Sequence, residues 1–568
     1  MPIYSNPRRG NTTLIVCTAV ALAAMLAIPL HRASGHSGQS IDGARGGISA
    51  GGELDNYLRY LETLGRVPLR PWSLRTFSAA TVDSLTTVSD AHPWAQSWIF
   101  QRATGSRHFA VLPVTAAVRF NSAFPYGSND GPIWAARGAT TSLQGGVALA
   151  WGPLSAVLDP MVFRAENRAF TLQPNGQSGI GRFANGDFPT EVDRPQRYGD
   201  GAYSKFDLGE STVRLDMFGV SAGITTANQW WGPATVFPVI LGNNAPGVPQ
   251  FFLGTEHPTN IWIGRVQARV VYGVERQSDF SPVVGPDTFV NGDLSGRRRF
   301  MSGLVATFTP APIPALELGA ARYFHQAWFG SIGSRELRSP FEGILKSSIP
   351  QGVAVPGADT QDALKNQLAS VFARWVLPHS GFEVYGEYGH EDHNYDLRDL
   401  AQEPDHSRIA MAGLRKVFEH GGGKFSAFRA EFIDATSPSL LRHRAEGLIY
   451  VHYPLKQGHT QDGQLLGADI GVGSPAGANL AWESYSPSGR TTWYVQRVVQ
   501  NNQATFIYSG IETVGASHLF GTVGYERHRF GSVADITYGA SLTEGKRGPS
   551  LPRETNIGAS IAVTAHSW

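Results

Sequence analysis

Two rhythms of apolar positions divide the chain. From Glu53 to Leu64, apolar residues recur at the spacing of one helical face, and Gly65 and Pro68 end the pattern, which predicts an amphipathic helix. A second, shorter helix is predicted from Ala79 to Val88. From about residue 108 onward the period changes from 3.6 to 2, which is the period of β-strands.

The strand pattern then returns many times. It is clearest in three segments whose every second residue is apolar: Ala110 to Phe120, Val266 to Val274, and Ala369 to Leu377. Counting weaker runs, we expect about 18 strands. A soluble β protein turns its apolar face inward, whereas a transmembrane barrel turns it toward lipid, and alternation alone does not distinguish the two. Strands of about ten residues and aromatic residues near many strand ends favour an all-β transmembrane antiparallel barrel.

The first 35 residues have the layout of a secretory signal. Arg8 and Arg9 precede an apolar run from Leu14 to Leu30, and the small residues Ala33 to Gly35 follow it. A retained membrane anchor is the alternative, because a run of this length is near the lower limit for a spanning helix. Cys17 is the only cysteine and lies in this run, so the processed chain is expected to contain no disulfide and no cysteine metal site.

The predicted organisation is a signal peptide at 1–35, a flexible Gly/Ser-rich linker at 36–52, a helical plug region at 53–107 and an outer-membrane barrel at 108–568. After the signal, no apolar stretch is long enough for a spanning helix, so the chain would have to enter a membrane as a barrel. The net charge of +1 provides no basic surface for nucleic acid.

Several segments resemble the Wzi capsule-assembly family. The longest runs from Gln229 to Gly273 and contains Trp231-Gly232-Pro233, Asn243-Asn244-Ala245-Pro246-Gly247 and Gly264-Arg265; the others are Tyr198 to Asp216, Glu383 to His393, Glu403 to Lys416 and Gly463 to Gly471. The resemblance implies an 18-stranded outer-membrane barrel, plugged by helices near its periplasmic end, in a family that attaches capsular polysaccharide to the cell surface as a lectin. The outward loops match least, so the identity of the sugar does not carry over.

Five residues of the longest matching segment are candidates for polysaccharide binding. Exposed indole faces of Trp230 and Trp231 could stack on sugar rings, and the amides of Asn243 and Asn244 could bond hydroxyls. Arg265 opens a strand in the same segment. The alternative is that the asparagines bond the backbone of a turn while the tryptophans pack in a plug or girdle. We favour this alternative, because turn chemistry alone accounts for the residue types.

Glu383 and Glu387 are the most suggestive carboxyl pair. They share one face of a predicted strand, but residues four apart on a strand lie about 13 Å from each other, too far for a glycosidase pair. We therefore interpret them as charges that face the lumen.

Three further polar clusters are assigned no catalytic or metal-binding role. The group from His390 to His393 fits a solvated loop better than a metal site. Asp405-His406-Ser407 fits a loop better than a hydrolase triad. Arg297-Arg298-Arg299 could face acidic sugars or lipid phosphates, or anchor a strand edge. The sequence thus predicts no catalytic residue, no metal ligand and no cofactor.

Taken together, the sequence predicts a monomeric, non-enzymatic outer-membrane barrel that binds and anchors capsular or extracellular polysaccharide and contacts outer-membrane lipid. A porin that conducts small solutes is the first alternative, and an outer-membrane hydrolase the second.

Overall fold

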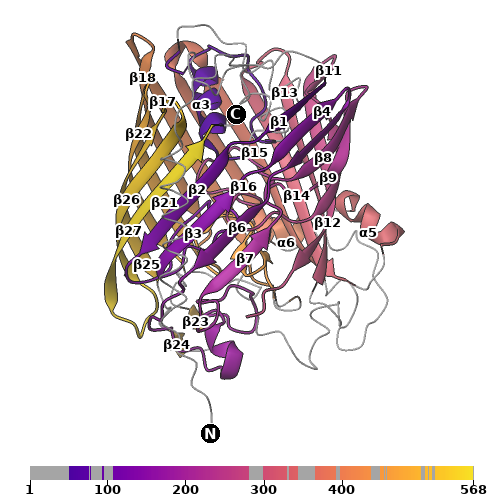
Figure 1. Cartoon of the computed structure of the whole chain (residues 1–568). Helices are drawn as coiled ribbons and strands as arrows, with labels where there is room; N and C mark the ends of the chain where they lie inside the picture. The colour runs from indigo at the N-terminus through magenta and orange to yellow at the C-terminus, as the bar shows by residue number, and fades with distance from the viewer. Residues whose placement is uncertain are drawn as a thin grey trace.

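The computed structural model describes residues 50–75, 77, 92–94, 107–280, 298–328, 332–342, 365–391, 397–436, 448–452, 455, 457–500, 506–508, 511–513 and 518–566. The predicted signal peptide, most of the predicted linker and the predicted helix Ala79–Val88 lie outside these residues, as do Arg297 and His393. The described part is an all-β barrel with few helices (Figure 1).

A 23-stranded antiparallel sheet forms the wall. Five of its strands (β2, β4, β6, β8 and β11) continue the strand before them across breaks of two to four residues, which leaves eighteen strand positions around the wall, the number predicted. The bounds are β1 Arg107–Val111, β2 Val114–Asn121, β3 Gly138–Gln144, β4 Val147–Trp151, β5 Leu154–Leu158, β6 Met161–Ala165, β7 Tyr203–Asp207, β8 Thr212–Met217, β9 Val220–Thr225, β10 Gln250–Thr255, β11 Thr259–Ile261, β12 Gly264–Arg276, β13 Arg298–Pro310, β14 Leu316–Ala327, β15 Lys365–Leu377, β16 Phe382–Glu391, β17 Arg408–Gly421, β18 Lys424–Asp434, β21 Ala476–Ser486, β22 Gly489–Val499, β25 Leu519–Arg529, β26 Ala534–Lys546 and β27 Arg553–Ala565.

The last strand lies against the first. β27 pairs with β26 on one side and with β2 on the other, in register from Val114↔Ala565 to Asn121↔Gly558. Outside the wall sheet, β19 Thr460–Gln461 pairs with β20 Gln464–Leu465, and β23 Phe506–Tyr508 pairs with β24 Ile511–Thr513. The remaining elements are short: helices α5 Ser334–Arg338 and α6 Leu397–Gln402, and 3₁₀ turns Gly179–Phe183, Ser339–Phe341 and Pro378–Ser380.

The two ends of the barrel differ in the length of their connections. At the end drawn at the top of Figure 1, tight turns join neighbouring strands, for example β17 to β18 and β21 to β22. At the opposite end the connections are long, including residues 166–202, 226–249 and 435–475. Outer-membrane barrels have short periplasmic turns and long extracellular loops. We therefore assign the long-loop end to the cell exterior.

The apolar faces of the strands point away from the barrel axis. In β15, Val371 is 60% exposed and Trp375 46%, whereas the alternating Ser370 and Arg374 are buried in the lumen. β12 follows the same rule, since Gln267, Arg269 and Glu275 are buried on its inner face. An exterior of exposed valine and tryptophan with an interior of buried arginine is the polarity of a barrel in lipid.

The first strand is where the sequence prediction is wrong. Its apolar positions were expected to lie on one face from Ala110 to Phe120, but a break at Leu112-Pro113 changes the phase. Before the break Phe109 is 63% exposed and Ala110 is buried. After it, Phe120 is 38% exposed and Asn121 is buried. Proline cannot donate to the ladder, which explains why the strand breaks at this point.

The predicted N-terminal helix is confirmed as α3, Glu53–Thr63, and it lies inside the tight-turn end of the barrel (Figure 1). Tyr57, Leu58 and Leu61 pack with Phe425 and Tyr485, which project inward from β18 and β21. Among the described residues, no helix is long and apolar enough to cross a membrane.

Two connections fold back into the lumen and fill it. One is residues 227–249, between β9 and β10, and the other is the described part of the connection between β18 and β21, residues 448–452, 455 and 457–473. They contribute Trp231, Phe237, Ile240, Tyr450 and Ile470 to the largest apolar cluster. That cluster also contains side chains from the inner face of the wall, including Tyr323, Phe372, Met411 and Ile433. The lumen is therefore a packed core in the described part of the chain.

Carboxylates on the inner wall bind backbone amides of the inward segments. Glu317 accepts hydrogen bonds from the backbone N–H groups of Trp72 (3.1 Å) and Ser73 (3.0 Å). Glu431 accepts them from three consecutive residues, 235 to 237, at 2.6 to 2.8 Å. These bonds satisfy amides that would otherwise be buried without partners, which is costly.

Candidate functional site

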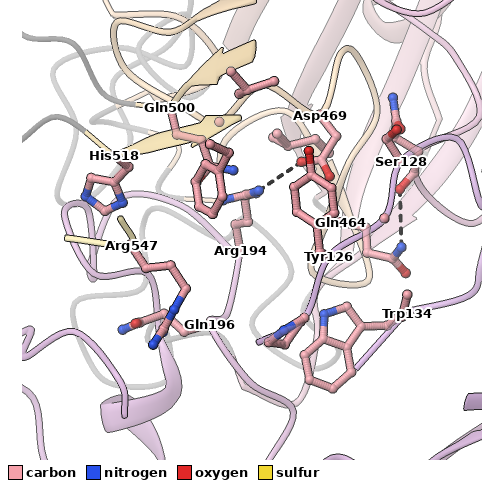
Figure 2. A pocket seen from close by; sticks show the side chains of 18 of the residues that line it. Tyr126, Ser128, Trp134, Arg194, Gln196, Gln464, Asp469, Gln500, His518 and Arg547 are labelled. Carbon is pink, nitrogen blue, oxygen red and sulfur yellow. Dashed lines mark hydrogen bonds and ion pairs between the residues drawn. The ribbon is translucent and has the colours of Figure 1, made fainter. Parts of the chain in front are cut away.

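A pocket of about 200 Å³ opens at the long-loop end of the barrel. Its lining comes from the connections at 125–135, 170–196 and 463–472, from the ends of β22 and β25, and from the turn between β26 and β27. Figure 2 shows side chains from these segments converging on one space, although they are hundreds of residues apart in sequence.

Ion pairs tie the charged groups of the pocket together. Arg194 pairs with Asp469 at 2.8 Å, and His518 lies 3.0 Å from Asp187. Asp187 also accepts a hydrogen bond from the side chain of Gln173 at 2.7 Å. These contacts hold loops from different parts of the chain in fixed positions, which leaves the pocket largely preformed.

Amides and aromatic rings complete the lining. Gln196, Gln464 and Gln500 project from three different connections (Figure 2). Trp134 is half-buried, and its ring centroid lies 4.6 Å from that of Tyr198. The hydroxyl of Tyr126 is 2.7 Å from that of Thr522. Burial raises the pKa of Tyr126, so its phenol stays protonated.

The predicted asparagine turn supports one wall of this pocket. Asn244 lines it; its side-chain oxygen accepts from the backbone N–H of Asn129 at 2.6 Å, and its amide nitrogen donates to the carbonyl of Gly467 at 2.8 Å. Asn243 donates to the carbonyl of Asn129 at 3.2 Å and accepts from Asn228. Both amides thus bond mainly the protein itself, as the turn interpretation expects.

The other three candidate residues lie away from the pocket. Trp230 and Trp231 are 0% exposed, so neither indole presents a face to a sugar. Trp230 donates to the carbonyl of Ala234 at 3.0 Å and lies under the guanidinium of Arg75, while Trp231 belongs to the lumen core. Arg265 is at the start of β12, at the tight-turn end, far from the long loops.

The polar clusters that the sequence singled out have structural roles in the described part of the chain. The interpretation of His390 to His393 as a solvated loop is wrong for His390 and Glu391, which end β16, and Glu391 is buried and accepts a hydrogen bond from Asn366 at 2.8 Å. Glu383 and Glu387 face the lumen and are buried, as predicted. The segment Asp405-His406-Ser407 is a turn before β17. Arg299 corrects the expectation of an exposed strand-edge anchor, because it is fully buried, 3.2 Å from Glu275. No group of three or more potential metal ligands occurs in the described part of the chain.

Comparison with known proteins identifies the family. A family model described as "Capsule assembly protein Wzi" matches residues 142–538, well over half of the chain. The chain belongs to the Wzi family of capsule assembly proteins. Together with the lipid-facing wall, membership of the Wzi family places this protein in the outer membrane. No curated protein sequence matches the chain.

One of the matching solved structures shows the same fold, and two others match with lower scores. The structure of Wzi from Escherichia coli, described as an outer membrane protein involved in group 1 capsule assembly and a carbohydrate-binding β-barrel, has a TM-score of 0.59 at 16% identity, covering 92% of this chain and 99% of that chain. Acinetobacter baumannii OccAB2 has a TM-score of 0.37 at 12% identity, covering 82% and 99%. Pseudomonas aeruginosa OccK2 in complex with glucuronate has 0.37 at 9%, covering 80% and 98%.

Most pocket residues were missed by sequence reasoning. Gln196, Asp469 and Arg547 lie in connections without periodicity, and nothing in the sequence indicates that they meet. Two signals did point to the pocket: the turn residues of Asn243 to Gly247, of which Asn244 reaches it, and the family resemblance of Gly463 to Gly471, which contributes Gln464 and Asp469.

Proposed function

We propose that this member of the Wzi family binds capsular or extracellular polysaccharide in the pocket at the long-loop end and thereby retains it at the cell surface. The observation that carries the proposal is the lining itself: amides from several connections, paired charges and half-buried aromatic rings around one solvent-open space. Gln196 and the amide nitrogen of Gln464 bond backbone groups of the protein. We therefore assign the contacts with sugar hydroxyls to Gln500, to the side-chain oxygen of Gln464 and to the paired charges, while aromatic faces pack against the apolar faces of sugar rings.

The pocket suits recognition of a polymer from outside the cell. Concave sites with a few convergent polar groups on a largely preformed scaffold are typical of ligand binding. Trp134 and Tyr126 lie on one loop, and Gln464 and Asp469 lie on another, so a sugar residue between them would contact both. Of the candidate residues from the sequence, we assign Asn243 and Asn244 the role of holding the loops that form one wall of the pocket.

The filled lumen favours binding over conduction. The segment at 227–249 and the described residues between 448 and 473 pack against the inner wall, and α3 lies within the tight-turn end. A porin needs an aqueous channel through the barrel. We therefore propose a plugged, non-enzymatic barrel, in keeping with the wide separation of Glu383 and Glu387 along one strand.

The test is direct binding. Purified full-length protein in detergent is titrated with the polysaccharide that its own cell produces, and calorimetry measures the heat of binding. A neutral dextran serves as the control polymer. We expect saturable binding of the cognate polymer alone. Equal binding of dextran, or no binding of either, would contradict the proposal. Planar-bilayer recording in parallel tests the porin alternative, for which steady conductance is expected.

A further inference from the structure

The outer face of the barrel carries a covered polar patch over β13, β14 and β15. In the direction of the long loops the outward residues of each strand become mixed: Leu304 is followed by Ser302 and Phe300 on β13, Ala320 by Arg322 and Phe324 on β14, and Ala369 by Gln367 and Lys365 on β15. Polar and charged groups therefore enter the outer face here beside aromatic rings, as expected at the level where the outer leaflet passes from acyl chains to headgroups.

A folded segment lies over this patch. Residues 332–342, which include α5 and the following 3₁₀ turn, pack against the outside of β13 and β14 (Figure 1). Tyr272 on β12 donates to the carbonyl of Leu337 at 2.7 Å. Arg322 bonds the carbonyl of Glu342, and Lys365 bonds its carboxylate. The segment is thus fastened to the lipid-facing side of the wall.

The fastened segment presents apolar side chains outward. Ile332 is 53% exposed, Leu337 48% and Phe341 64%. Their exposure on the outside of the barrel, beside the upper edge of the apolar band, fits contact with acyl chains.

Among the described residues around this segment, cations outnumber carboxylates. Arg298 and Arg338 are exposed, and Arg322 and Lys365 lie beneath the segment, both over the ring of Phe324 at 4.4 and 4.5 Å. Opposite these four cations, the segment supplies two carboxylates, and one of them, Glu336, caps the backbone N–H of Gly333 at 2.7 Å. The balance leaves positive charge available at headgroup depth.

We propose that this surface, formed by residues 332–342 with Arg298, is a binding site for a phosphorylated glycolipid of the outer leaflet. Arg298 and Arg338 contact the phosphate, and the apolar residues of the segment contact the acyl chains. Guanidinium groups suit this ligand because they bond phosphate oxygens in a bidentate manner. The buried pair Arg322 and Lys365 holds the segment in place and adds to the local potential.

The test is lipid retention by the purified full-length protein, measured by native mass spectrometry after incubation with bisphosphorylated lipid A or with phosphatidylcholine. We expect the wild type to retain the phosphorylated lipid and the variant R298Q/R338Q to lose about thirtyfold in apparent affinity, since each cation near an anionic lipid surface contributes a factor of about five. Both arginines are exposed, so the variant is expected to fold.

The matched control is R497Q/R553Q, which removes two exposed cations from β22 and β27, outside the proposed patch. Its retention of lipid A should stay within about twofold of the wild type. Equal retention of phosphatidylcholine and lipid A, or equal losses in the two double variants, would overturn the proposal. Loss of polysaccharide binding in R298Q/R338Q with lipid retention unchanged would assign the patch to the glycan instead, and the wild-type titration reports the proposed function separately.

Discussion

Glu383 is the residue on which the docking of α3 depends most. Its carboxylate is fully buried and lies 2.9 Å from the Nε atoms of both Arg59 and Arg374, with Arg415 at 3.9 Å. Thr63, at the end of the helix, donates to it at 3.3 Å. One carboxylate thus neutralises guanidinium groups from the helix and from two neighbouring strands.

The substitution E383Q keeps the shape of the side chain and removes its charge. Arg374 keeps Glu62 and, at 3.6 Å, Glu317 as partners, but Arg59 loses the carboxylate it bonds through two nitrogens. Breaking a buried pair from one side costs about 3–5 kcal/mol. Since about 1.4 kcal/mol corresponds to a factor of ten, the equilibrium for helix docking should shift by roughly two to three and a half orders of magnitude.

Two measurements report this shift. Thermal unfolding in detergent should show an earlier transition, and planar-bilayer recordings should show channel openings that the wild type lacks. The matched control is E419Q, because Glu419 pairs at 2.8 Å with Arg66 just after the same helix, but the two side chains are 51% and 40% exposed. That exposed pair is expected to contribute less than about 1 kcal/mol. If E383Q and E419Q behave alike in both assays, the buried cluster does not hold the helix.

Three other outcomes follow from the structure. Replacing Trp134 by alanine should weaken polysaccharide binding by about tenfold through loss of ring contact, while W262A, at an indole that is 94% exposed at the opposite end, leaves calorimetric affinity unchanged. G232A should lower the free energy of unfolding by about 1–3 kcal/mol, because a Cβ at this position would overlap a carboxylate of the wall. The control G219A has a similar positive φ but open space around the Cβ, so it measures the cost of the backbone conformation alone. Burial raises the pKa of Asp193 to about 6, so the stability that this carboxyl contributes is present below about pH 4 and lost as pH rises through 6. Melting curves of D193N should lack this pH-dependent loss of stability between about pH 4 and 7, and a pH dependence equal to that of the wild type would contradict the assignment.

The barrel was predictable because its period is simple. Alternation in β12 and β15 predicted the strands and their two faces correctly. Strand length and the aromatic residues near strand ends indicated that the apolar faces point outward, and the family resemblance agreed. The phase change at Leu112-Pro113 was missed because the residues on both sides of the break are apolar, so the pattern reads as continuous. Burial, which sequence cannot provide, separates Phe109 from Ala110.

The site was much less predictable, for a physical reason. Arg194 and Asp469 belong to loops 275 residues apart, and only the curvature of the wall brings them within 2.8 Å. Arg299 illustrates the same limit: in a run of three arginines it suggests an exposed basic patch, yet its register partner across the sheet is Glu275, and both are buried. Local sequence shows residue types, whereas pairing partners depend on strand register.

The carboxylates of the inner wall bond main-chain amides, as Glu431 does with three consecutive ones. Every amino acid except proline supplies such an amide, so these anchors place few demands on which side chains the inward segments carry. Relatives can therefore differ in most side chains of the segments that fill the barrel while the backbone of those segments follows the same course, provided that the acidic residues of the wall are kept. This arrangement permits the sequences of the lumen segments to diverge while the carboxylates that anchor them stay constant.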